Sequence, residues 1–482
     1  MHKLADRAIN IATQLGASYA DARAIWQKRE FIQTKDEKLA ALNLTESVGI
    51  GIRILCDGGW GFASTQKLTK NGVDNAVRRA MAVARASASC VSPPITLAFE
   101  PAYQSTWISP HLIDPFKISI ENKLAVLLQC ASIMRSVEGV CMTQGEMTFT
   151  KEHKIFVSTE GSCIDQTFIR SSCGIEANAF SPNDRQKRSW PNSFGGQHEN
   201  AGWEIVEKWQ LPQNAQRIAE EAVALLTAPE CEKRRADVIV GASQLALQVH
   251  ESCGHPSELD RALGHEANFA GTSFLTPSML GNLQYGSSSV NLVADATASG
   301  ALGGFAFDDE GVQAQCIDLV KDGVFVGYLS SRDTANLIGL ARSGGAVRAQ
   351  GWNNQPIIRM TNISLRPGSA GSLADLIADT EDGILMETNK SWSIDDKRYN
   401  FQFGMEAGYE IKGGKITRLI KNPSYGGITT PFWNSCDAIC DKESYNDWGV
   451  PNCGKGQPCQ TMWTGHGAAP ARFRNIEIGV TK

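Results

Sequence analysis

The segment from His250 to His255 combines residue types and a spacing that could do chemistry. It reads HESCGH, with two histidines five positions apart and Glu251 directly after the first. Neutral imidazoles are preferred ligands of Zn²⁺, and a carboxylate beside the first ligand can take a proton from a metal-bound water. The segment therefore predicts a zinc-dependent hydrolytic centre with His250 and His255 as ligands and Glu251 as general base.

The spacing of the two histidines does not suit a regular zinc-binding helix. Side chains advance by about 100° per residue, so residues five apart point about 140° away from each other and could not share one ion. Gly254 permits positive φ, and Pro256 disfavours the helical conformation at His255. We therefore expect the last turn to widen or unwind near Gly254. The alternative is an ordinary helix over residues 243–255 with its histidines at a fraying end.

A catalytic zinc site needs a third protein ligand and an open fourth position. Spacing alone leaves the third ligand open among acidic, histidine and cysteine side chains downstream: Glu258, Asp260, His265, Glu266, Asp308, Asp309, Glu310 and the later cysteines. Cys436, Cys440, Cys453 and Cys459 could instead form a separate structural zinc site. Their C-x3-C and C-x5-C spacings are poor for a zinc ribbon.

The elements that must position this site are those of an α+β chain. Residues 1–92 predict an N-terminal α/β region with helices on a mixed sheet. Apolar residues at helical spacing mark helices over residues 4–15 and 73–84, the second capped by Asn71, and alternation over residues 48–62 marks a hairpin between them.

Residues 93–230 predict a middle α/β region. Five prolines between residues 91 and 117 indicate a connection, and Ser119 is placed to cap a helix. A β-rich stretch follows to about residue 180. Residues 181–200 are rich in Asn, Gly, Ser and Pro, which predicts a polar segment that could be a mobile loop unless Trp190 pins it.

Residues 231–482 predict a C-terminal, mainly antiparallel β domain that carries the HExxxH helix. A short buried strand at residues 238–240 leads into a helix that begins near Ser243. Turn residues at 321–323 and 413–414 separate apolar runs and predict hairpins.

Composition excludes several functional classes. The 482 residues carry a formal net charge of −5, which gives no basic field for a nucleic acid. No apolar run approaches the roughly 18 residues needed to cross a bilayer, and charges interrupt the apolar residues at the N-terminus, so we expect neither membrane association nor a signal peptide. Thirteen scattered cysteines indicate a reducing cytoplasm.

Taken in order along the chain, these motifs resemble the TldD/PmbA metalloproteases, and within them the TldD-like, metal-binding subunit. The resemblance covers nearly the whole chain and rests on HESCGH, FDDEG at residues 307–311, RMTN at 359–362 and CGK at 453–455. It implies that His250, His255 and Cys453 bind zinc and that Glu251 is the catalytic carboxylate.

The resemblance also implies a partner and a substrate. The partner would be a related PmbA/TldE-like subunit in a heterodimer, or a second copy in a homodimer. The substrates would be unfolded polypeptides or small modified peptides, bound in extended form. Pro256 and Ser257 depart from the residues that commonly follow the family motif, and residues 431–450 add Cys436 and Cys440.

Two other functions fit parts of the pattern. A non-catalytic peptide-binding or regulatory subunit would keep the histidines for structural reasons, but an intact HExxxH with Cys453 argues against it. Dipeptidyl peptidase III enzymes carry a similar HExxGH motif in a mostly helical lobe, and the hairpins predicted after residue 310 argue against that class.

Overall fold

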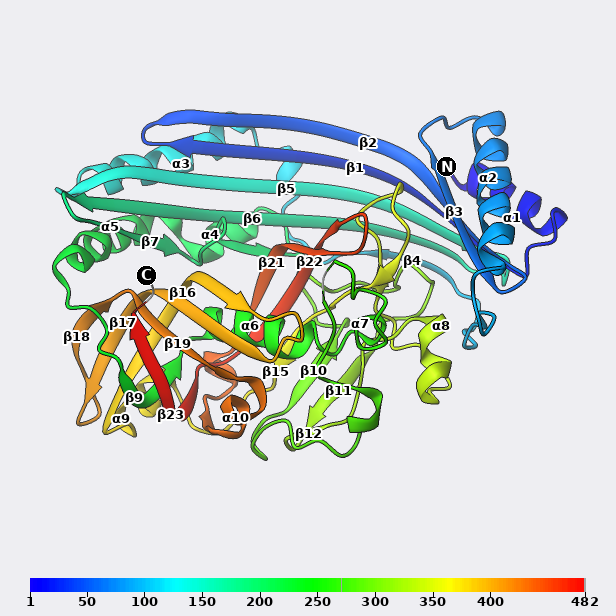
Figure 1. Ribbon diagram of the computed structural model, residues 1–482. Coiled ribbons are helices and arrows are strands. Elements are labelled where there is room, and N and C mark those ends of the chain that lie inside the picture. The colour runs from blue at the N-terminus through cyan, green and yellow to red at the C-terminus, as the bar shows by residue number, and fades with distance from the viewer. Residues whose placement is uncertain (270, 481–482) are drawn as a thin grey trace.

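A long, curved sheet lies along one side of the molecule, above a second, β-rich unit (Figure 1). The computed structural model describes residues 1–269 and 271–480. The sheet has eight strands in the order β3-β2-β1-β5-β6-β4, and β7 and β8 also pair with β6. Only β4 runs parallel to its neighbour. The strands are β1 (Tyr19–Lys35), β2 (Lys38–Cys56), β3 (Gly59–Thr65), β4 (Gln104–Ile108), β5 (Val140–Ser158), β6 (Cys163–Ser181), β7 (Asp184–Trp190) and β8 (Gln197–Glu199).

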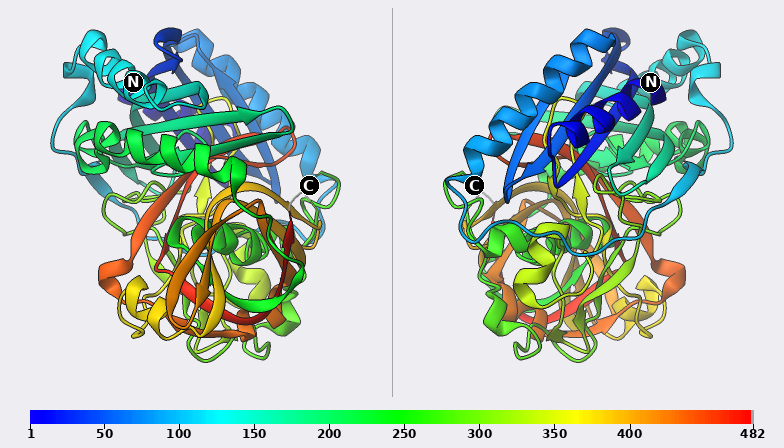
Figure 2. Two further views of the ribbon diagram at one scale, coloured as in Figure 1. Left: turned by 90° about the vertical axis from the view of Figure 1, so that its left-hand side faces the viewer. Right: turned by 90° about the vertical axis from the view of Figure 1, so that its right-hand side faces the viewer.

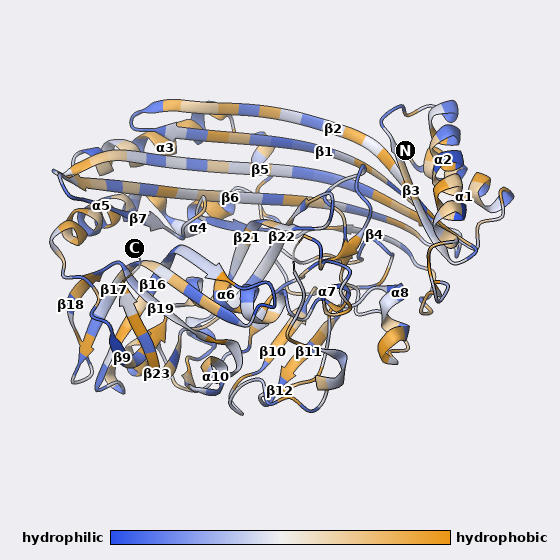
Figure 3. Ribbon diagram, viewed as in Figure 1, coloured by the Kyte–Doolittle hydropathy of each residue, from blue (hydrophilic) through white to orange (hydrophobic). Residues whose placement is uncertain are grey.

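Two pairs of helices cover the two ends of this sheet (Figures 1 and 2). Polar and apolar residues are interspersed along the long strands (Figure 3), and apolar side chains near each end of the sheet belong to two separate cores. At one end, Ile50, Ile52 and Ile54 of β2 share a buried core with α1 and α2; at the other, α3 and α5 pack on β5 and β6. The helices of this half are α1 (His2–Gln14), α2 (Lys70–Ala88), η1 (Pro115–Lys117), α3 (Ile120–Arg135), α4 (Glu204–Trp209) and α5 (Leu211–Thr227).

The starts of two helices test the capping predictions. The Ser119 hydroxyl accepts a hydrogen bond from the Asn122 backbone N–H, so the predicted cap of α3 is confirmed. The predicted cap of α2 at Asn71 is wrong. The hydroxyl of Thr69 accepts from Gly72 N instead, because the helix begins at Lys70, three residues before its apolar stripe starts at Val73.

Two other expectations for this half need correction. The proline-rich connection carries the short strand β4, which pairs with β6. Residues 181–200 are not a polar loop, because they contain β7 and β8. Polar residues of β7 contact acidic side chains. Arg188 forms an ion pair with Glu221 at 2.8 Å, and the Ser189 hydroxyl donates a hydrogen bond to Glu406.

The C-terminal unit is built around a ring of five strands. The pairings run β16-β9-β23-β19-β17 and return to β16, and all are antiparallel except β16–β9. Aromatic side chains, among them Phe403, Tyr425 and Phe473, fill the core of this unit. The sheet consists of β9 (Arg234–Val240), β16 (Asp382–Ile394), β17 (Asn400–Lys412), β18 (Lys415–Lys421), β19 (Pro423–Ile428), β20 (Cys436–Ile439) and β23 (Ala471–Val480).

Smaller sheets and short helices surround this ring. The further strands are β10 (Leu292–Asp295), β11 (Cys316–Lys321), β12 (Val324–Phe325), β13 (Val347–Arg348), β14 (Ile357–Ile358), β15 (Ile363–Leu365), β21 (Asn446–Lys455) and β22 (Gln460–Ala468). The helices are α6 (Ala242–Val249), η2 (His250–Gly254), α7 (Leu259–Ala262), η3 (Pro277–Met279), α8 (Arg332–Ala335), η4 (Asn336–Ile338), α9 (Leu373–Ala378), α10 (Thr429–Asn434) and η5 (Lys442–Ser444).

The architecture confirms the α+β class, with a β-rich C-terminal unit that carries the HExxxH segment. The hairpins expected at residues 321–323 and 413–414 are β11–β12 and β17–β18. The boundaries expected at residues 92–93 and 230–231 stay predictions. Within the described residues, no helix is both long and apolar enough to cross a membrane.

Candidate metal centre

The two histidines of the motif lie on a widened helical turn. Helix α6 is α-helical to Val249, and η2 continues it as a π-helical turn in which His255 N–H donates to His250 O at 3.1 Å. Gly254 allows this turn to approach its neighbour, because a Cβ atom there would overlap Met360 Sδ. The predicted break from regular helix near Gly254 is confirmed, and it turns the two rings toward one another.

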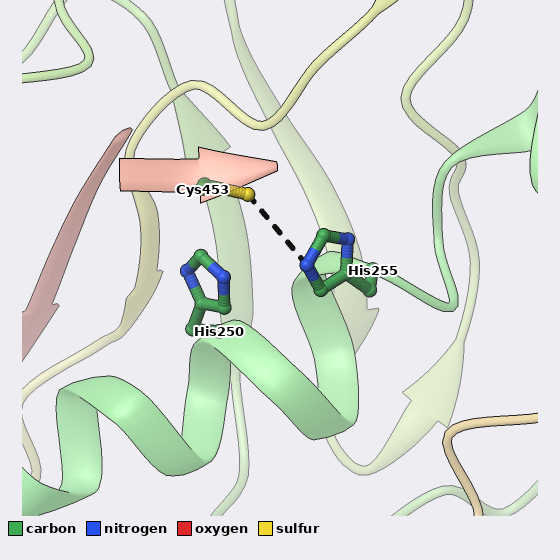
Figure 4. Close-up of side chains that lie close together, drawn as sticks. All are labelled: His250, His255 and Cys453. Carbon is green, nitrogen blue, oxygen red and sulfur yellow. Dashed lines mark hydrogen bonds between the residues drawn. The ribbon is translucent and has the colours of Figure 1, made fainter. Parts of the chain in front are cut away.

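Cys453 on β21 completes a compact group with the two histidines (Figure 4). The ring centroids of His250 and His255 are 4.9 Å apart, and Cys453 Sγ lies 3.6 Å from His255 Nε2. One potential ligand atom from each residue lies within 4.8 Å of the other two. None of the three residues is more than 4% exposed. Two imidazoles and a thiol at this separation suit a transition-metal ion of the softer kind.

Buried acceptors behind the rings orient both imidazoles. Nδ1 of His255 lies 2.9 Å from Glu258 Oε2, and Nδ1 of His250 lies 2.7 Å from Nε2 of His466. The other nitrogen of His466 lies 3.1 Å from Ile363 O, which accepts its proton and leaves Nε2 as an acceptor for His250. Both motif histidines thus keep Nε2 for a metal.

The electrostatics of the group favour the metal-binding protonation states. Burial lowers the pKa of His250 to about 4 and that of His255 well below its usual value, so both rings are neutral at pH 7. Burial raises the pKa of the Cys453 thiol, but His255 and the Arg359 guanidinium outweigh that effect and bring the pKa below its usual value. Arg359 also donates to the Cys453 carbonyl oxygen.

Glu251 faces a pocket of about 210 Å³ beside the three side chains. Its Oε1 accepts from Trp392 Nε1 at 3.0 Å, and its Oε2 accepts from Arg398 Nη1 at 2.8 Å. Trp392 lies on β16 and Arg398 in the turn that follows. Neither residue carries a signal in the sequence, because each lies more than 140 positions from Glu251. The pocket is also lined by Phe194, Asn389 and residues 448–454 of β21.

The structure gives the other candidate ligands different partners or positions. Glu258 supports His255 instead, and Asp260 pairs with Lys455 at 2.7 Å. Asp309 and Glu310 pair with basic residues of the long sheet. His265 and Glu266 line a separate cavity of about 540 Å³.

The alternative structural zinc site is not assembled. Among residues 1–269 and 271–480, the group of His250, His255 and Cys453 has no second example with comparable spacing. Cys436 and Cys440 are buried in the C-terminal core, and Cys459 is exposed.

Comparison with known proteins identifies the family of this chain. Three models match in order: the PmbA/TldA metallopeptidase domain 1 over residues 20–84, the central domain over 113–228 and the C-terminal domain over 233–478. The chain belongs to the PmbA/TldD metallopeptidase family. The matched C-terminal model contains the whole candidate metal centre, and the resemblance found in the sequence motifs is confirmed.

Relatives within the PmbA/TldD family carry metalloprotease names. A metalloprotease of Methanothermobacter thermautotrophicus is 29% identical over 463 residues, which are 96% of each chain. A zinc metalloprotease TldD homolog of Saccharolobus solfataricus is 22% identical over 480 residues, which are 98% of each chain.

Solved structures of low sequence identity share the fold. A putative modulator of a DNA gyrase from Thermotoga maritima superposes with a TM-score of 0.77 at 16% identity, covering 99% of both chains. TldE from Thermococcus kodakarensis superposes with a TM-score of 0.73 at 14% identity, covering 99% of this chain and 100% of that one.

Proposed function

We propose that this PmbA/TldD chain is a zinc-dependent peptidase that hydrolyses unfolded polypeptides or small modified peptides. The observation that carries the proposal is the buried group of His250, His255 and Cys453, with Glu251 facing the adjoining pocket. Two neutral imidazoles and a thiolate form a ligand set that suits zinc and leaves a fourth position for water or substrate. The relative from Saccharolobus solfataricus that is named a zinc metalloprotease TldD homolog supports the choice of metal.

His250 and His255 would hold the ion through Nε2, and Cys453 through Sγ. A bound zinc ion supplies Lewis-acid chemistry, which acidifies water and withdraws electron density from a carbonyl oxygen. Glu258 and His466 orient the two imidazoles, and Arg359 holds the Cys453 backbone through its carbonyl oxygen. That arrangement reduces the ordering cost of binding.

Glu251 is the proton carrier in this proposal. As general base it accepts the proton of the attacking water and then delivers it to the leaving amine. Each of its oxygens accepts one hydrogen bond, from Trp392 or from Arg398, and a carboxylate oxygen has a second lone pair that can accept from the water. The bonds from Trp392 and Arg398 keep the carboxylate aimed at the pocket.

The active assembly would be a dimer. The proposed partner is a PmbA/TldE-like subunit or a second copy of this chain. Family membership and the shared fold with TldE from Thermococcus kodakarensis support it.

Glu251→Gln tests the proposed function by separating metal binding from catalysis. Glutamine keeps the shape and the hydrogen-bond acceptor but cannot accept a proton at neutral pH, so hydrolysis of an unstructured peptide should fall about 10²- to 10⁴-fold while zinc stays bound. Cys453→Ala should lose zinc and activity together, whereas Glu443→Gln on the surface should change neither. Wild-type hydrolysis rates in Glu251→Gln would contradict the assignment of the base.

A further inference from the structure

A second cavity, of about 650 Å³, adjoins the pocket of the metal centre. It lies between the long sheet and the C-terminal unit, where β21 and β22 reach up toward the sheet (Figure 1). Phe194, Pro451 and Asn452 line both this cavity and the pocket that Glu251 faces. A peptide bound in extended form beside Glu251 therefore has the cavity next to it.

Arg170 presents a preorganised guanidinium on the sheet side of this cavity. Its Cζ lies 4.3 Å from the ring centroids of both Phe168 and Trp463, so the group is stacked between two aromatic faces. Its carboxylate neighbour, Glu152, is 3.7 Å away, longer than a normal hydrogen bond. Two aromatic rings and a long ion pair with Glu152 hold the guanidinium in place, and Nε and Nη1 are left without a hydrogen-bond acceptor.

Arg348 lines the cavity from the C-terminal unit. It is 8% exposed, and it donates to the carbonyl oxygens of Trp463 and Met360. Within the described parts of the chain, no carboxylate oxygen lies within ion-pair distance of Arg348. Burial and the positive charges of Arg359 and Arg170 lower its pKa to about 9, the sign of an uncompensated cation. Leaving a buried charge without a counterion is costly unless a ligand supplies one.

Trp463 links the two arginines. Its ring stacks on Arg170, and its carbonyl oxygen accepts from Arg348 at 2.8 Å. Two guanidinium groups thus flank one residue of β22 at the cavity wall. Paired, planar N–H donors of this kind match the two oxygens of a carboxylate.

Three of the carboxylates that line the same cavity contact basic side chains. Glu152 lies 3.7 Å from Arg170 and 3.8 Å from Lys154. Glu176 pairs with Lys187 at 2.9 Å, and Asp309 pairs with Lys154 at 2.8 Å. Burial raises the pKa of Glu146, which favours its neutral form. Among the described residues, Arg348 therefore has no carboxylate at ion-pair distance, and Arg170 shares Glu152 with Lys154.

We propose that Arg170 and Arg348 form a carboxylate-binding subsite, so that this chain prefers peptides with a carboxylate a few residues from the cleaved bond. The carboxylate is either the α-carboxylate of the peptide C-terminus or the side chain of Asp or Glu. The proposal rests on the proposed peptidase function and adds a substrate preference to it.

A series of short peptides with a single carboxylate tests the subsite on the metal-loaded full chain with any partner it requires. One arm compares free and amidated C-termini; the other compares Glu with Gln at successive positions of amidated peptides. Charge-assisted hydrogen bonds predict that kcat/KM for the best-placed carboxylate exceeds that of its neutral counterpart by about 10- to 100-fold. The arm that shows the preference identifies the source of the carboxylate.

If the two arginines cause the preference for a carboxylate, substitution of either arginine should remove it. Arg170→Gln and Arg348→Lys should each bring the carboxylate-to-neutral ratio below about threefold, and Arg170→Lys should recover part of it. Arg185→Gln is the matched control, because Arg185 also stacks on a phenylalanine, Phe180, but lies on β7 outside the cavity. A preference that survives in Arg170→Gln and Arg348→Lys would overturn the subsite, as would its absence from the unmodified chain.

A binding measurement distinguishes failure of the subsite from failure of the peptidase. Fluorescence anisotropy of labelled D-peptides, with and without the carboxylate, reports binding to the Glu251→Gln chain in the absence of hydrolysis. Preferential binding of the carboxylate form, without hydrolysis of any peptide by the unmodified chain, would contradict the proposed function and support the subsite. Hydrolysis together with equal binding of both forms would support the function and contradict the subsite.

Discussion

At the scale of single residues, the metal centre depends on side chains that would not touch the ion. The Nε2 atom of His466 lies 2.7 Å from Nδ1 of His250, and the other ring nitrogen of His466 is fixed by Ile363 O. Removing such a partner frees the ligand ring to rotate, which typically costs about 10- to 100-fold in metal affinity. We predict a loss of that size in His466→Ala, measured by competition with a zinc chelator.

A second histidine provides the control for this prediction. His111, whose Nδ1 lies 2.9 Å from Ser109 O, is remote from the centre, and His111→Ala should leave zinc affinity unchanged. Unchanged affinity in His466→Ala would show that the orientation of His250 does not depend on His466.

The residues of the centre differ in how far the sequence can predict them. His250, Glu251 and His255 lie within six positions of the chain, so their spacing is informative by itself. Cys453 is distinguished from the other candidates only through a family resemblance. His466 lies 216 positions from the ring it supports, and local pattern has no access to a contact that the fold creates over that distance.

At the scale of elements, the widened turn η2 is the feature that brings the two histidines together. Gly254 lies against Met360 Sδ with no space for a Cβ atom. We predict that Gly254→Ala destabilises the chain by about 1–3 kcal/mol and reduces zinc content, because the added methyl group pushes the turn away from Met360. Thermal unfolding and elemental analysis of the same samples measure both effects.

A second glycine separates this effect from the general cost of an added methyl group. A Cβ atom at Gly427 would make only ordinary van der Waals contacts, 3.6 Å from the Phe401 ring at the nearest, and the φ of Gly427 is not positive. Gly427→Ala should retain its zinc and nearly all its stability. If Gly254→Ala also retained both, close packing at η2 would not be required for the site.

Elements with strong local signals are predictable from the sequence, and those that depend on distant partners are not. The hairpin at residues 413–414 and the helix after Ser119 follow from turn and cap chemistry. The 17-residue strand β1 has no clear local signal, since it lies between β2 and β5 and its polar residues resemble those of a surface segment. Strand β7 resembles a loop because its charged residues find buried partners only in the folded chain.

At the scale of the whole molecule, ion pairs hold the long sheet on the C-terminal unit. Asp309 of the FDDEG motif lies 2.8 Å from Lys154 of β5 and 3.5 Å from Arg23 of β1. Breaking a buried pair by removing one partner typically costs about 3–5 kcal/mol. We predict a loss of that size in Asp309→Asn at pH 7, measured by denaturant unfolding, while the zinc ligands remain in place.

The pH dependence of this loss follows from the pKa of Asp309. Burial raises that pKa, but the positive charges of Lys154 and Arg23 lower it by a larger amount. The net shift of the pKa in the folded chain is therefore downward. The stabilisation that the Asp309 ion pairs provide is therefore complete above the pKa of Asp309 in the unfolded chain, about 4. It disappears as the pH falls through the lower pKa of Asp309 in the folded chain. The stability difference between the unmodified chain and Asp309→Asn should narrow below about pH 4. If the stability difference between the unmodified chain and Asp309→Asn did not change with pH, packing and not the charge of Asp309 would be its cause.

Elemental analysis of the purified chain tests most directly whether His250, His255 and Cys453 hold one zinc ion. The unmodified chain should contain about one zinc per molecule. His250→Ala/His255→Ala should contain only background amounts, while the control variant His111→Ala/His153→Ala should match the unmodified chain. Equal, stoichiometric zinc in the unmodified chain and in His250→Ala/His255→Ala would contradict the account.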